Sequence, residues 1–212
     1  MFDTITFFVG RLRQVGLFDT HELADVFNKI GTAFDDQDYR SWLMGEVALA
    51  YADTGLFDQA ERFASQVETY ERAQFFRKLA GIEVHSHAQQ RGVASLRAAE
   101  LACALFPTEW QRAECLCSIA ESWFSELNDR GEAIRVWQSA ADAALLGESS
   151  ASRNTTTASD TASVLLQVCR SMSHAGYAEQ ATRVASLISC IDTRNRALSE
   201  IAKTTGPHPA GS

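Results

Sequence analysis

Two cysteines, Cys115 and Cys117, stand two residues apart in the stretch RAECLCSIAESWF, which begins at Arg112. Paired thiols can hold a metal ion or form a redox pair. On an α-helix, however, the side chains of residues i and i+2 project about 200° apart, so these two thiols cannot coordinate the same ion. Structural zinc sites also draw a second pair of ligands from elsewhere in the chain. The spacing therefore favours small buried side chains, and we expect neither a bound metal nor a cofactor.

Two further pairs of residues carry chemistry. His85 and His87 also diverge on a helix, so the same argument applies to them. Glu114 and Glu121 share one helix face, a spacing that suits acid–base chemistry but is common on exposed helices. The chain contains no motif of zinc proteases, phosphate-binding loops, dinucleotide-binding folds or serine hydrolases. We therefore expect a protein that is not an enzyme.

The composition excludes several classes of partner. The 212 residues carry a net charge of -8, which argues against nucleic acid because phosphate binding needs clustered Lys and Arg. No apolar run reaches the roughly 18 residues of a membrane span, so we expect no membrane contact. The apolar opening ITFFVG lacks the basic leader of a signal peptide. Five cysteines without disulfide-scaffold spacing fit a reducing cytoplasm.

The paired cysteines lie within a segment that recurs along the chain. We number each copy from its first residue, so that repeat position 3 is the third residue after it. Positions 3, 4 and 7 form an apolar stripe on an α-helix, and a small residue follows at position 8. Cys115 fills position 3, as Leu43 and Phe75 do, so we predict that it is a core residue. The copies are RSWLMGEVA (40–48), RAQFFRKLA (72–80), RAECLCSIA (112–120), TASVLLQVC (161–169) and RNRALSEIA (194–202).

A second segment follows most copies. GLFDQAERFASQV begins at Gly55, and GYAEQATRVASLI begins at Gly176. The glycine suits a helix C-terminus that needs a positive φ, and the alanines that follow suit tight packing of a returning helix. Looser copies begin at Gly92 and Gly131. The repeating unit is therefore a helix, a short turn and a second helix.

Such a unit cannot bury its apolar stripe alone and must stack on its neighbours. We predict an all-α fold, an α-solenoid of stacked antiparallel helical hairpins with about 10–11 helices. We assign residues 1–205 to a single repeat domain and residues 206–212 to a disordered tail. The run GESSASRNTTTASD, residues 147–160, is polar and rich in Ser and Thr, so we predict a flexible loop there.

The hairpins resemble tetratricopeptide-type (TPR) repeats over residues 40–202. The resemblance is clearest in AYADTGLFDQA, residues 50–60. At the family's aromatic position one copy has Met172 and another has Glu83, and the family's terminal proline is absent. The small, aromatic, glycine and alanine positions are matched by Ala48, Tyr51, Gly55 and Ala60, and then by Cys169, Met172, Gly176 and Ala181.

This resemblance implies a function and a site. In that family the first helices line a groove that holds a peptide or a partner protein. We therefore expect a non-catalytic adaptor, scaffold or chaperone-like module, and the acidic net charge favours a basic partner segment. Each candidate residue could equally be ordinary solvated helix surface. By position, the expected partner-binding residues are Trp42, Asp53, Gln74, Arg77, His85, Glu114, Glu121, Ser125, Arg170 and His174.

Two other functions stay open. The chain could be a structural subunit of a homo-oligomer, because aromatic residues crowd the segment before residue 39 and would either cap the array or form a homodimer interface. It could also be an enzyme or ligand-binding protein with a pocket between helices, using His85, His174 or the Glu114 and Glu121 face. The crowded aromatic residues are Phe7, Phe8, Phe18, Phe27 and Phe34.

Overall fold

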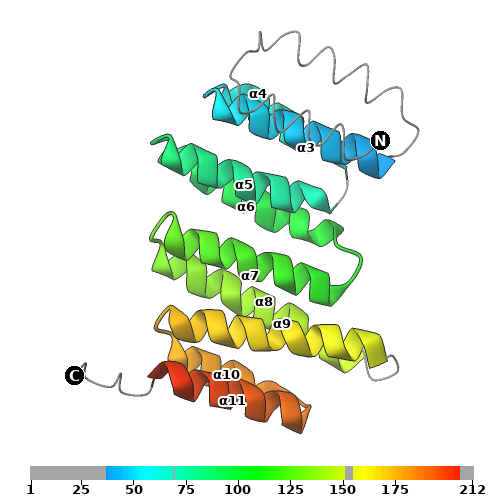
Figure 1. Ribbon diagram of the computed structural model, residues 1–212, viewed down its shortest axis with the longest axis vertical. Helices are drawn as coiled ribbons and strands as arrows, with labels where there is room; N and C mark the ends of the chain where they lie inside the picture. The colour runs from blue at the N-terminus through cyan, green and yellow to red at the C-terminus, as the bar shows by residue number, and fades with distance from the viewer. Residues whose placement is uncertain (1–36, 69, 151–154, 206–212) are drawn as a thin grey trace, which may run out of the picture. The chain divides into compact units, whose positions relative to one another are not determined.

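The computed structural model describes residues 37–68, 70–150 and 155–205. Within these ranges the regular structure is helical, no strand occurs, and the helices pack in adjacent pairs (Figure 1). The all-α prediction is confirmed for this part of the chain. The predictions for the first 36 residues and for the tail at 206–212 lie outside the described residues. No described helix has the length and apolarity that crossing a membrane requires.

The chain divides into two compact units, residues 1–105 and residues 106–212. The assignment of residues 1–205 to a single domain stays a prediction. The described helices of the first unit are α3 (Gln37–Asp53), α4 (Phe57–Ser65), α5 (Glu71–His85), α6 (Gln89–Ala102) and the short 3-10 helix η1 (Cys103–Leu105). The described helices of the second unit are α7 (Glu109–Ser125), α8 (Arg130–Ser150), α9 (Thr155–His174), α10 (Ala178–Leu187) and α11 (Ile191–Thr205).

The recurring apolar stripe forms the core of each unit. Repeat positions 3 and 7 are buried in all five copies, and position 8 is buried in every copy except the last, where Ala202 is exposed. Cys115 is buried at position 3, which confirms its predicted role as a core residue. The buried residues at positions 3 and 7 are Leu43, Phe75, Cys115, Val164 and Ala197, and Val47, Leu79, Ile119, Val168 and Ile201.

One core position carries an acid. Three residues after repeat position 8, the other hairpins bury Tyr51, Trp123 and Met172, whereas the hairpin of α5 and α6 buries Glu83. Oε2 of Glu83 accepts a hydrogen bond from the Ser95 hydroxyl at 2.7 Å. Oε1 is buried without a hydrogen-bond partner among the described residues. Burial raises the pKa of Glu83 to about 7, because a carboxylate loses its hydration there.

The turns of two hairpins follow the sequence prediction. Gly55 and Gly176 adopt φ values of 79° and 90°, the left-handed conformation that glycine tolerates best. The amide of Leu56 donates back to the Tyr51 carbonyl at 3.0 Å, and the equivalent bond after Gly176 is 2.8 Å long. These bonds close the ends of α3 and α9 in the manner of a Schellman motif.

The prediction that Gly92 and Gly131 are turn residues is wrong, because Gly92 lies inside α6 and Gly131 lies inside α8. The left-handed turn positions are instead held by His87, with φ 63°, and Asn128, with φ 51°. Gly92 serves a different purpose. A Cβ atom there would lie 2.5 Å from Cγ2 of Val84, so its absence lets α6 approach α5 closely.

The loop predicted over residues 147–160 is also wrong for residues 147–150 and 155–160, which extend α8 and α9. Tertiary packing outweighs the weak helix propensity of Ser and Thr here. A Cβ at Gly147 would lie 3.4 Å from Cβ of Glu109 and 3.6 Å from Cγ2 of Thr161, so α8 packs tightly at this end. The Glu148 carboxylate accepts hydrogen bonds from the amides of Ser189 and Cys190, each 3.0 Å long.

Candidate functional site

The first helices of successive hairpins are neighbours within each unit. In the first unit α3 packs on α5, and in the second unit α7 packs on α9 and α9 on α11 (Figure 1). The predicted partner-binding residues occupy repeat positions 2, 5, 9 and 13. Such spacings of three and four residues keep side chains on one side of a helix. We call this side the first-helix face of each unit.

In the first unit the first-helix face is mostly solvent-exposed. Asp53, Gln74 and His85 are exposed, whereas Trp42 and Arg77 are half-buried. Nδ1 of His85 lies 2.6 Å from the carbonyl oxygen of Gly81 one turn earlier, which fixes its ring on its own helix. The packing of α3 on α5 brings these residues onto adjacent helices, and their role in binding stays a prediction.

In the second unit polar contacts join the first helices to one another. The Ser171 hydroxyl on α9 donates to Oε1 of Glu121 on α7 at 2.6 Å. Arg170 on α9 pairs with Glu200 on α11 at 3.4 Å, and Lys203 approaches the same carboxylate to 2.7 Å. The hydrogen bond from Lys203 lowers the pKa of Glu200 and keeps it charged. Glu121 and Arg170 of this first-helix face are therefore each in contact with a neighbouring first helix.

The remaining predicted residues of the second unit, Glu114, Ser125 and His174, are exposed. The Ser125 hydroxyl donates to the Glu121 carbonyl at 2.8 Å, a bond within its own helix. Glu114 and Glu121 lie on the same helix as predicted, and of these two carboxylates it is Glu121 that accepts the bond from the Ser171 hydroxyl. The structure thus assigns the two carboxylates different surroundings.

Ser171, Glu200 and Lys203 take part in these contacts but are not among the residues predicted from the sequence. A signal for Lys203 was present, because it occupies repeat position 9, as Glu121 and Arg170 do. Ser171 and Glu200 stand at positions without such a precedent. Their contacts arise from the way α7, α9 and α11 pack, which no local pattern encodes.

The thiol of Cys117, which lies beside Glu121 and Ser171, is not activated as a nucleophile. Its Sγ lies 3.9 Å from Oε1 of Glu121 and 3.8 Å from Oγ of Ser171. Burial, reinforced by the charge of Glu121, raises the pKa of Cys117 to about 12. The thiol therefore stays protonated at neutral pH, and a thiol is a poor nucleophile. Among the described residues no three His, Cys, Asp or Glu side chains are grouped so as to hold a metal ion.

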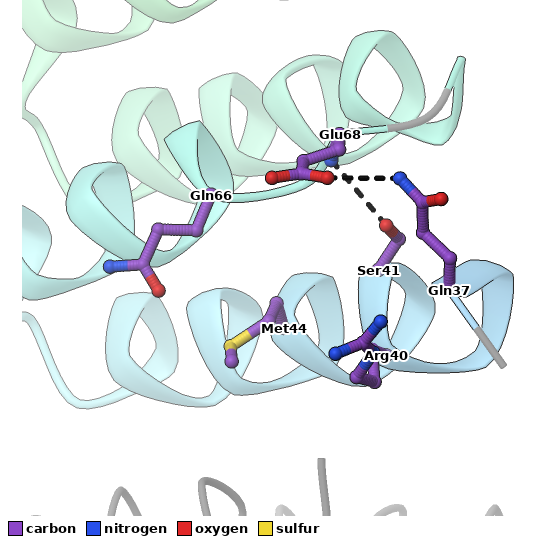
Figure 2. Close-up of a pocket in the computed structure, with 6 residues that line it drawn as sticks. All are labelled: Gln37, Arg40, Ser41, Met44, Gln66 and Glu68. Carbon is purple, nitrogen blue, oxygen red and sulfur yellow. Dashed lines mark hydrogen bonds between the residues drawn. The ribbon is translucent and has the colours of Figure 1, made fainter. Parts of the chain in front are cut away.

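A hollow of about 330 Å³ lies between α3 and the segment after α4 (Figure 2). Its wall is ordered by Nε2 of Gln37, which donates to Oε2 of Glu68 at 2.9 Å, and by the Glu68 amide, 3.4 Å from Oγ of Ser41. Ser41 directly precedes Trp42, so on a helix the two side chains project about 100° apart. The hollow is therefore not part of the first-helix face. The lining residues are Gln37, Arg40, Ser41, Met44, Gln66 and Glu68.

Arg40 in this hollow begins the first copy of the repeat, and its equivalents have other surroundings. Nε of Arg72 donates to the Val67 carbonyl, and Arg112 pairs with Glu109 at 3.8 Å. The guanidinium of Arg40 has no hydrogen-bond or ion-pair partner among the residues that the structure describes. Arginine recurs at the start of four copies, but its contacts differ from one copy to the next.

No protein-family model, curated protein or solved structure matches the chain. The class that the fold defines is an all-α protein with helices packed in adjacent pairs, an arrangement compatible with a helical repeat.

Proposed function

We propose that the chain is a tetratricopeptide-like α-solenoid of the cytoplasm, whose first-helix faces bind a peptide or another protein without catalysis. The repeated turn supports this proposal. In each of four hairpins, a backbone amide in the turn donates a hydrogen bond to the carbonyl of the residue at the same core position. The relevant carbonyls belong to Tyr51, Glu83, Trp123 and Met172.

The observation that carries the proposal is the first-helix face of the second unit. Glu121 and Arg170 are in contact with Ser171 and Glu200, so both side chains have a preferred position before a partner arrives. Such preorganisation lowers the entropic cost of association. Glu114 is exposed on the same face and offers a carboxylate to a basic residue of the partner.

A binding role also agrees with the chemistry of the side chains that meet on this face. Cys117, Glu121 and Ser171 come together, yet the thiol is held protonated by burial and the serine hydroxyl is hydrogen-bonded to a carboxylate. Nucleophilic catalysis needs an activated nucleophile next to a base oriented for it. The group instead orders the contact between α7 and α9.

The proposal is tested by reversing the charge of arginines on the first helices and, as a control, on the second helices of the hairpins. Tagged wild-type protein and the variants Arg77→Glu and Arg170→Glu are used to capture partners from the source cell. A captured protein is then purified, and its affinity for each variant is measured by calorimetry. Arg97→Glu on α6 and Arg183→Glu on α10 are the controls, because both residues are exposed on second helices.

Arg183 is a close match for Arg170, since each is ion-paired on the surface, with Glu179 and with Glu200 respectively. We expect at least one first-helix variant to weaken binding about tenfold, the size typical of a contributing interface charge. We expect both second-helix variants to bind like the wild type. Equal binding by all four variants, each folded by circular dichroism, would refute the assignment of the first-helix face.

A further inference from the structure

One side of α11 is exposed although its counterparts on α7 and α9 are buried. At repeat position 4, Leu116 of α7 is 5% exposed and Leu165 of α9 is 0% exposed, whereas Leu198 of α11 is 37% exposed. Position 8 is buried on α7 and α9, yet Ala202 of α11 is exposed. These positions are buried in α7 and α9, which have other helices packed around them, and no described helix covers them on α11.

The exposed side carries three apolar residues, with the polar Asn195 between the first two. Ile191, Leu198 and Ala202 follow one another at spacings of seven and four residues, which places them on one side of the helix. Ile191 is 62% exposed, and Leu187, just before α11, is 64% exposed. We call Ile191, Asn195, Leu198 and Ala202 the open stripe of α11. Apolar side chains exposed at a helix register that is buried on α7 and α9 are available to a further partner.

The open stripe does not overlap the first-helix face. Glu200, which contacts Arg170 of α9, stands two residues after Leu198 and therefore projects about 200° away from it. Figure 1 shows the same order within the second unit, where α9 lies between α7 and α11. A molecule bound to the open stripe therefore leaves Arg170 and Glu200 accessible.

The charges beside the open stripe favour a second copy of the same helix. Asp192 and Lys203 are eleven residues apart, about three turns, so they flank the stripe on the same side. If two α11 helices pack antiparallel about a twofold axis, Asp192 of each copy faces Lys203 of the other. Both ion pairs then form at once, and the two helix dipoles also oppose each other. In a parallel arrangement the twofold axis would place these residues of the two copies on opposite sides of the contact, so neither ion pair would form.

We propose that the open stripe is the interface of a homodimer in which α11 packs antiparallel against α11 of a second copy. This goes beyond the proposed partner binding and does not depend on it, because the apolar contact lies on a different side of the helix from Arg170 and Glu200; Lys203 alone stands at a position of the first-helix face. Leu198 lies near the twofold axis, where the side chains of both copies meet. Lys203 is 67% exposed and its ammonium group has three N–H donors, so it can bond Asp192 of the second copy while it keeps its bond to Glu200.

The first test is the oligomeric state of the full chain. Sedimentation velocity from about 1 µM to about 100 µM covers the range in which modest dimers dissociate. We expect the wild type to dimerise, and we expect Leu198→Glu to weaken the dimer by roughly 100-fold, because a carboxylate would be buried at the contact. Leu101→Glu, at an exposed leucine of α6 in the first unit, is the matched control and should dimerise normally.

The second test addresses the antiparallel arrangement. Asp192→Lys and Lys203→Asp should each weaken the dimer about tenfold, since either change breaks both ion pairs. Combining them should restore dimerisation, because the exchanged charges again face each other. A wild type that stays monomeric at about 100 µM, or a dimer that survives Leu198→Glu, overturns the proposal. A double variant weaker than both single variants, with circular dichroism unchanged, overturns the antiparallel pairing. The Leu198→Glu and Asp192→Lys results do not bear on partner capture through Arg77 and Arg170, so failure of the dimer and failure of partner binding are distinguishable.

Discussion

Replacing Glu83 by glutamine should stabilise the protein at neutral pH and leave it almost unchanged at acidic pH. The side chain is buried between α5 and α6, Oε2 accepts a bond from Ser95, and Oε1 has no described partner. The charged groups that act on it are Glu61 of α4, which raises its pKa, and Arg91 of α6, which lowers it. Arg91 is already engaged with Asp58 and Glu61 at 2.6 and 2.7 Å, so it neutralises Glu83 only in part.

The sign follows from proton linkage. The pKa of Glu83 is about 7 in the folded chain and about 4.5 when unfolded, so the folded state holds the proton more tightly. Its contribution to stability is greatest below about pH 4.5, declines as pH rises toward 7, and is constant above that. The difference between the two pKa values limits the loss of folding free energy to roughly 3 kcal/mol, at about 1.4 kcal/mol per pH unit. Glutamine has no proton to lose and avoids this penalty.

Urea unfolding followed by circular dichroism, from about pH 5 to about pH 8, measures the effect. The difference between Glu83→Gln and wild type should be under about 1 kcal/mol at the acidic end and should grow to about 2–3 kcal/mol at the alkaline end. Taking the difference removes the titration of every other group. Glu83→Met should behave similarly, because Met172 fills the equivalent core position in the α9–α10 hairpin.

Ser95→Ala is the companion variant for Glu83. The Ser95 hydroxyl lowers the pKa of Glu83, so its removal should destabilise the protein more at pH 8 than at pH 5. A difference between Glu83→Gln and wild type that is flat across the pH range would show that Glu83 is hydrated in the folded chain. A difference of opposite slope would show that the carboxylate has a cationic partner there.

Three further predictions concern backbone and thiols. Gly92→Ala should cost about 1–3 kcal/mol in urea unfolding through overpacking against α5, whereas Gly131→Ala, whose Cβ would meet nothing nearer than 3.5 Å, should cost nothing and gain up to about 1 kcal/mol. His87→Gly should stabilise the protein by about 1 kcal/mol in the same assay, and Gly55→Ala should destabilise it by a similar amount, because both residues adopt positive φ. A thiol reagent should modify one cysteine rapidly in the folded protein. Cys190 is exposed and hydrogen bonds from Thr193 lower its pKa, whereas the other four cysteines are buried. Cys190→Ser should abolish the rapid phase of the modification reaction.

The core was predictable because its residues recur with the periodicity of an α-helix. A stripe at positions 3, 4 and 7 is visible in five copies, and it explained Cys115 as an apolar residue before any contact was known. The turns at Gly55 and Gly176 were predictable for the same reason, since glycine marks a positive φ. His87 and Asn128 take the same conformation without that marker, and so the glycines that followed were misread as turn residues.

The contacts of the candidate site were less predictable. The register placed Glu121 and Arg170 on first helices, but their partners Ser171 and Glu200 are set by how α7, α9 and α11 pack. The same limit explains the loop predicted at residues 147–160. Composition alone suggested a flexible segment, whereas the amides before α11 bind Glu148, a contact 41 residues distant in sequence.

The repeat register of the second unit also explains why it can offer two separate surfaces. Repeat position 9 carries Arg170 and Lys203 on the side where the first helices bind one another by polar contacts. Position 4 lies on a different side, and there Leu116 and Leu165 are buried while Leu198 is exposed. Because the two positions are five residues apart, they project about 140° from each other on a helix. A dimer formed through Leu198 would therefore double the number of first-helix faces in one assembly, and a partner with two binding segments would gain avidity from them without any new contact.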